Sequence, residues 1–143
     1  MFAFLQRLIG RNNPAPESGG LGERLAADWL ERERHFQILT RNWRSPKDRR
    51  DEVDLVCHDR DILVFVEVKA RAVGALVPGY HAVDRRKKRA LRRAIRTYLA
   101  QLRVKPRTFR FDIVEVSLAA AGAAAPEILH FENVALFSKN FRG

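Results

Sequence analysis

Two carboxylates and a lysine stand out because they interrupt two otherwise apolar runs of the chain. The runs Glu52–Cys57 and Ile62–Lys69 have the composition of β-strands, and the polar residues 58–61 between them predict a hairpin. Side chains alternate between the two faces of a strand. Asp54 and Glu67 therefore share one face for any regular hairpin with a loop of even length. Their Cβ atoms would then lie within about 5 to 8 Å of each other.

Two registers of this hairpin keep the acids on one face. A loop centred between Asp59 and Arg60 places Asp54 opposite Phe65, with Glu67 as its diagonal neighbour. A shift by two residues places Asp54 directly opposite Glu67. Only a bulge or a loop of odd length would separate the two acids, so their proximity depends on a regular hairpin.

Two carboxylates this close in an apolar strand pair are unfavourable unless a cation neutralises them. Asp54 and Glu67 are therefore candidate ligands of Mg²⁺ (or Mn²⁺), and Mg²⁺ takes oxygen ligands at about 2.0 to 2.1 Å. Lys69 lies about 6 to 7 Å further along the strand on the face of Glu67, within reach of a phosphate oxygen beside the cation. This set of groups suits phosphodiester hydrolysis, because the cation polarises the phosphate and the lysine stabilises the developing charge. The structural alternative is a buried ion pair between Lys69 and one of the acids.

Positive charge is concentrated in one segment. The chain has 143 residues, with 27 Lys and Arg, 17 Asp and Glu, and a net charge of +10. Residues 71–110 contain 13 of the basic residues and one acid, a balance of +12, whereas the remainder has 14 basic and 16 acidic residues, a balance of −2. This asymmetry favours a polyanionic partner, with nucleic acid as the first candidate. The alternatives are a solvated helix face that binds nothing and, together with apolar residues 2–8, an anionic membrane surface.

The candidate contacts to nucleic acid follow the hairpin and continue along a predicted helix over residues 83–102. Lys87 lies four residues before Leu91, on the apolar stripe of this helix. Its ammonium could point toward the metal and the scissile phosphate, or its stem could snorkel along the core edge. The full set of candidates is Arg71, Arg85, Lys87, Lys88, Arg89, Arg92, Arg93 and Arg96.

The elements that position these residues follow from the hydrophobic periodicity. Helices are predicted over residues 21–34 and 83–102, and strands over 36–43, 52–57, 62–69, 109–116 and, as an edge strand, 128–136. The third run is apolar on both faces, which is typical of a central strand covered by helices. The order predicts an α/β fold with a mixed central sheet flanked by helices. We expect one domain over residues 19–136, a flexible segment over 1–18 and a tail over 137–143.

Length and composition exclude several classes of protein. A single Cys excludes a disulfide framework and a Cys-rich zinc module. No apolar run approaches 18 residues, so no membrane span is predicted. The first nine residues lack the features of a signal peptide, and we expect a cytoplasmic protein. The four His residues show no metal-ligand spacing and are predicted to lie on the surface or in loops.

The same residues carry a resemblance to known proteins. Asp54, separated by twelve residues from Glu67-Val68-Lys69, resembles the PD-(D/E)XK motif of restriction enzymes and Holliday-junction resolvases. The wider pattern is similar to the YraN-like family of small, endonuclease-related bacterial proteins. One departure is Asp51, which stands where that family usually has Gly. The matching strings, in order, are Gly22-Glu23, Asn42-Trp43-Arg44, Glu52 to Val56, Phe65 to Arg71 and Arg110-Phe111-Asp112.

The resemblance implies a restriction-endonuclease-like αβββαβ core, with Asp54 and Glu67 as metal ligands and Lys69 as the catalytic lysine. It also implies an accessory acid from the first helix, Glu23. The implied activity is metal-dependent cleavage of DNA, with branched or damaged DNA as a candidate substrate. RNA is an alternative partner that the sequence leaves open. Resolvase-like action would imply a homodimer. The alternative function is nucleic-acid binding without catalysis through the basic helix.

Overall fold

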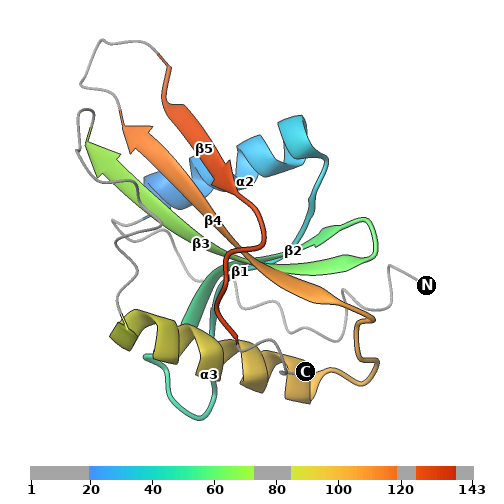
Figure 1. Ribbon diagram of the computed structural model, residues 1–143. Coiled ribbons are helices and arrows are strands. Elements are labelled where there is room, and N and C mark those ends of the chain that lie inside the picture. The colour runs from blue at the N-terminus through green and yellow to red at the C-terminus, as the bar shows by residue number, and fades with distance from the viewer. Residues whose placement is uncertain (1–19, 73–84, 119–124, 138–143) are drawn as a thin grey trace.

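The computed structural model describes residues 20–72, 85–118 and 125–137 (Figure 1). Two helices and five strands are present in this part of the chain. They are α2 (Gly20–Arg34), β1 (Gln37–Arg44), β2 (Glu52–Asp59), β3 (Ile62–Ala72), α3 (Arg85–Gln101), β4 (Phe109–Leu118) and β5 (Glu127–Phe131). The strands form one sheet in the order β1-β2-β3-β4-β5, in which only β3 and β4 pair in parallel. The predicted α/β fold with a mixed sheet flanked by helices is confirmed.

A two-residue loop, Arg60-Asp61, joins β2 to β3. Arg60 has a φ of 53°, as tight hairpin turns require, although it is not a glycine. β2 is therefore two residues longer than predicted. Continuing the observed register by one residue places Asp54 opposite Glu67. The other predicted register, with Asp54 opposite Phe65, is wrong.

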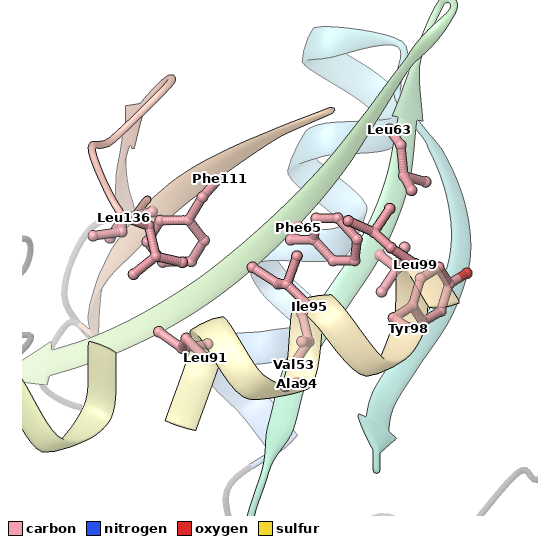
Figure 2. Packing of buried hydrophobic residues seen from close by; sticks show 12 residues of the cluster. Val53, Leu63, Phe65, Leu91, Ala94, Ile95, Tyr98, Leu99, Phe111 and Leu136 are labelled. Carbon is pink, nitrogen blue, oxygen red and sulfur yellow. The ribbon is translucent and has the colours of Figure 1, made fainter. Parts of the chain in front are cut away.

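Two apolar clusters lie on opposite faces of the sheet, one under each helix. Leu91 and Ile95 of α3 pack toward Phe65 of β3 (Figure 2). Leu30 of α2 belongs to the other cluster, together with Val66 of β3. Because Phe65 and Val66 are neighbours in sequence and are both fully buried, β3 is covered on both faces. The prediction that this strand is central is confirmed.

The last strand is shorter than predicted, because β5 ends at Phe131. Asn133 has a φ of 53°, a conformation that an extended strand does not accommodate. The chain then returns to the sheet, where Val134 donates a backbone hydrogen bond to Phe111 at 2.8 Å. Leu136, predicted as part of the strand, packs instead in the cluster under α3.

Several predictions concern segments outside the described residues. These are the segment 1–18, the first two residues of the helix predicted over 83–102, and all but the first residue of the tail over 137–143. Among the described residues, no helix is both long and apolar enough to cross a membrane.

Candidate active site

The two acids of the hairpin meet where pairing between β2 and β3 ends. Asp54 is 7% exposed and Glu67 is 3% exposed. The Val68 N–H donates a hydrogen bond of 2.8 Å to Asp54 Oδ2, so the Asp54 carboxylate lies against the strand residue next to Glu67. In Figure 1 the first turns of α2 and α3 both lie at the left, the side toward which β3 runs. The acids are therefore framed by one strand pair and the beginnings of two helices.

The Glu67 carboxylate is held by two lysines from different elements. Its Oε1 atom lies 3.3 Å from Lys87 Nζ on α3 and 3.5 Å from Lys69 Nζ on β3. Its Oε2 atom is buried and has no hydrogen-bond partner among the described residues. A buried carboxylate oxygen without a partner is unfavourable, and it offers a ligand position to a cation. Of the two orientations considered for Lys87, the structure has the one that points to the acids.

Burial and charge repulsion act on these groups together. Burial first, and then the neighbouring carboxylate of Glu67, raise the pKa of Asp54 well above its ordinary value, whereas the Val68 N–H acts in the opposite direction. Burial tends to lower the pKa of Lys87, but the attraction of Glu67 and Asp54 outweighs it, and the pKa is raised. Lys87 therefore keeps its positive charge. Asp54 ionises less readily than an isolated aspartate because it is buried beside the Glu67 carboxylate.

Glu23 reaches the site because α2 approaches β3 very closely. A Cβ atom on Gly22 would lie 2.8 Å from the Cβ atom of Ala70, too close for any residue but glycine without a shift of the helix. The half-buried Glu23 carboxylate forms a hydrogen bond with Asn42, which lowers its pKa. Burial raises that pKa more strongly, with smaller contributions from Glu52 and Glu67, and the net effect is an increase. The predicted accessory acid therefore lies close enough to Asp54 and Glu67 for their charges to interact.

The strand alternation that predicted the site is interrupted at Asp54 itself. Val53 packs under α3 and Leu55 packs under α2, although residues two apart should share a face. Asn42, across from Asp54 in the register of β1, has a φ of 50°. Asparagine tolerates this conformation better than most residues, which is the one signal in the sequence that could have indicated the distortion. The expectation that side chains alternate regularly between faces along the strand over residues 52–57 is wrong, yet the acids still meet.

Several of the predicted nucleic-acid contacts are engaged within the fold. The Arg93 guanidinium donates two hydrogen bonds to Asp51, at 3.0 and 2.8 Å. Arg92 donates to a backbone carbonyl of the segment after β5 at 3.1 Å. The Arg71 guanidinium lies 3.7 Å from Glu115 Oε1 on the neighbouring strand. In the sequence, Asp51 stands out only as a departure from a family pattern, and nothing there signals its ion pair.

The other candidates on α3 differ in how far they face solvent. Arg85 and Arg89 are exposed, and Lys88 is half-buried. The Arg96 guanidinium lies over the ring of Phe137, 5.8 Å from its centroid. The helix therefore has an exposed basic side that starts beside Lys87 and the acid pair.

A second buried polar cluster lies under α2. His130 was predicted on the surface or in a loop, but its side chain is only 2% exposed, and this prediction is wrong. β5 pairs with β4, which turns His130 toward α2 and places Nε2 2.8 Å from Asp112 Oδ2. Arg110 donates to the same carboxylate, and together with His130 and a backbone N–H of Asn133 it lowers the pKa of Asp112 against the opposing effect of burial. These contacts hold β4 to β5, although the buried His130 Nδ1 has no hydrogen-bond partner among the described residues.

Comparison with known proteins identifies the family. The Uncharacterised protein family UPF0102 matches residues 22–116. The chain belongs to this family. The UPF0102 protein of Beutenbergia cavernae is 43% identical over 78% of this chain and 91% of its own length. That of Geobacter metallireducens is 38% identical over 80% and 88%, and that of Anaeromyxobacter dehalogenans is 42% identical over 79% of each.

This UPF0102 match confirms the YraN-like family assignment made from the ordered strings of the sequence. The matched range begins at Gly22, which allows the close approach of α2, and it ends within β4. It therefore includes both acids, both lysines and Glu23. The family name states no activity, so the function must be argued from the site.

Proposed function

We propose that this UPF0102 protein is a metal-dependent endonuclease that hydrolyses phosphodiester bonds in DNA through a restriction-endonuclease-like, PD-(D/E)XK arrangement. The observation that carries the proposal is the Glu67 carboxylate. One of its oxygens lies within 3.5 Å of two lysine ammonium groups, and the other is buried without a partner among the described residues. The contacts with the two lysines leave this second oxygen available as a ligand position for a cation.

The donor set fits a magnesium-type cation that also binds water and substrate. Within the described residues, no three or more His, Cys, Asp or Glu side chains form a group that could enclose a metal. Mg²⁺ commonly binds through one or two carboxylates and completes its shell with water and substrate phosphate oxygens. Asp54 and Glu67 would supply those two carboxylates. When bound, the cation would polarise the phosphate and lower the pKa of a coordinated water.

The lysines supply the positive charge that the reaction needs. The side chains of Lys69 and Lys87 are 27% and 32% exposed, so their ammonium groups face both Glu67 and solvent. A phosphate placed beside the acid pair would meet both ammonium groups, which stabilise negative charge that develops on its oxygens. Glu23, whose pKa is raised chiefly by burial, would orient a water next to the acid pair.

The exposed basic side of α3 favours a second candidate, a nucleic-acid-binding protein without catalysis. Both candidates predict binding that weakens as salt increases. They differ in what the acids do, because only the endonuclease requires Glu67 and a divalent cation for an observable reaction.

The experiment is a cleavage panel over linear, nicked, flapped and four-way DNA with Mg²⁺ or Mn²⁺. Glu67→Gln should abolish metal-dependent cleavage and leave DNA binding in chelator intact. Glu33→Gln, an exposed acid on α2, is the matched control and should cleave like the parent protein. Cleavage that persists in Glu67→Gln would remove the proposed site. Binding without cleavage of any substrate in the parent protein would favour the second candidate.

A further inference from the structure

The connection between β1 and β2 is fixed against α3 by one ion pair. Asp51 is 4% exposed, and its carboxylate receives two hydrogen bonds from the Arg93 guanidinium. The connection is also closed internally, because Ser45 N–H donates to the Asp51 carbonyl at 2.9 Å and Asp51 N–H donates to the Asp48 carbonyl at 3.0 Å. Figure 1 shows this connection, in teal, beside α3. Residues 45–51, the docking loop, therefore have a defined shape.

The docking loop adds exposed cations to those of the helix. Lys47 and Arg49 are exposed, and neither forms an ion pair with any residue in the ranges 20–72, 85–118 and 125–137. Arg86, Arg89 and Arg93 follow one another along one side of α3, over about 10 Å of helix axis. Because Arg93 belongs to this row and also binds Asp51, the docking loop lies alongside the helix cations.

This cationic surface begins at the acid pair. Lys87, in the first turn of α3, contacts Glu67 directly. Glu52 follows the docking loop, and its negative charge acts on both Glu23 and Lys87, so the loop ends close to the acid pair. A polyanion that lies along the loop and the helix would therefore pass over the candidate active site.

We infer that the docking loop and α3 together bind the phosphate backbone of duplex DNA, with the Asp51–Arg93 ion pair as the positioning contact. The inference rests on the proposed function only in placing the bound strand at the acid pair. Two elements that each carry cations suit the two phosphate strands of a duplex. The nearby aromatic residue Trp43 packs edge-on against Tyr98 at 5.3 Å between ring centroids, so it serves the core and not base stacking. The surface contacts phosphates and does not read base sequence.

The first test compares two double variants that each remove two positive charges. Lys47→Gln/Arg49→Gln alters the docking loop, and Arg32→Gln/Arg107→Gln alters exposed positions on α2 and beyond the end of α3. Binding to a short labelled duplex is measured by fluorescence anisotropy in chelator over a range of salt concentrations. For the loop variant we expect the slope of log K against log[salt] to fall by about 1 for each phosphate that is no longer bound, hence by about 2. Equal slopes for the two variants would overturn the inference.

The second test uses the sign of the effect of Asp51→Asn. By charge alone, removing an acid from a basic surface should strengthen binding to DNA. If Asp51 positions the loop, binding weakens although the net charge rises by one. If Asp51→Asn has the same Tm as the parent protein and binds DNA more strongly, the positioning role is overturned. The Lys47→Gln/Arg49→Gln variant tests the cationic surface independently of this substitution.

Two further comparisons separate the surface from other assignments. A single strand of the same sequence, or vesicles of anionic lipid, should compete poorly with the duplex, and competition as strong as the duplex would overturn the duplex assignment. Duplexes of different sequence should bind equally. If the endonuclease proposal is wrong, metal-dependent cleavage will be absent while these binding results stay as expected. If the binding-surface inference is wrong, the loop variant will have an unchanged salt slope while cleavage is intact.

Discussion

Asp54→Asn should stabilise the metal-free protein, although it alters a buried, hydrogen-bonded residue. Substitution of such a residue normally destabilises a protein. Here the native carboxylate is buried opposite a second acid, and no bound cation offsets their repulsion in chelator. The asparagine side-chain oxygen can still accept the hydrogen bond that Val68 N–H donates to Asp54 at 2.8 Å. The substitution therefore removes a charge and keeps the contact.

The size of the effect follows from how close the two carboxylates lie. Although β2 is distorted at Asp54, the Asp54 carboxylate accepts a hydrogen bond from Val68 N–H, so it lies on the order of 5 Å from the side chain of the adjacent Glu67. Two like charges about 5 Å apart repel each other by about 3 kcal/mol at an effective dielectric constant of about 20. The lysines on Glu67 and the Val68 N–H offset part of this repulsion. We expect the free energy of unfolding to rise by about 1 to 2 kcal/mol, or about 3 to 8 °C in Tm.

The effect should also depend on pH in a defined direction. Because burial and Glu67 raise the pKa of Asp54, the folded protein holds this proton more tightly than the unfolded chain. The stabilisation that protonation provides is complete below the unfolded pKa of about 3.9 and is lost as the pH rises through the folded pKa. The gain from Asp54→Asn should therefore be small near pH 4 and largest at neutral pH.

Urea and thermal unfolding in chelator, at several pH values, measure both effects. Glu33→Gln serves as the control for the loss of one acid from the surface, and its effect should be near zero at every pH. A neutral-pH stability of Asp54→Asn below that of the parent would contradict the reasoning. So would a stability difference that does not change with pH.

Four other substitutions have defined outcomes. Lys69→Met and Lys87→Met should each reduce the single-turnover cleavage rate by about 10²- to 10³-fold; a normal rate would remove that lysine from the site. Gly22→Ala should destabilise the protein by about 1 to 3 kcal/mol in urea unfolding, because its Cβ atom would meet β3 at 2.8 Å. Asp112→Asn should cost about 3 to 5 kcal/mol in the same assay, since it leaves the buried Arg110 guanidinium without its main partner. A normal urea midpoint for either variant would contradict the packing described.

The parts of the site that local pattern controls could be predicted from the sequence. The apolar run of β3 identified the central strand, and Glu67 was recognisable as the charged residue within it. Lys87 could be placed from its position on the apolar stripe of α3, four residues before Leu91. These features depend on side-chain periodicity, which the sequence displays directly.

Features that depend on unusual backbone conformations or on distant residues could not be predicted. The hairpin register depended on Arg60, whose φ of 53° is uncommon for a residue with a side chain. The Asp51–Arg93 and Asp112–His130 pairs join residues 42 and 18 positions apart, and no local pattern specifies such a partner. The docking loop and the second buried cluster were missed for this reason.

Isothermal titration calorimetry of Mg²⁺ and Mn²⁺ tests most directly whether the acid pair is a cation site. We predict that the parent protein and Glu33→Gln bind the divalent cation with the same affinity, whereas Glu67→Gln and Asp54→Asn lose the binding. The loss in Asp54→Asn should accompany its higher stability in chelator. Unchanged cation binding by Glu67→Gln would contradict the site described here.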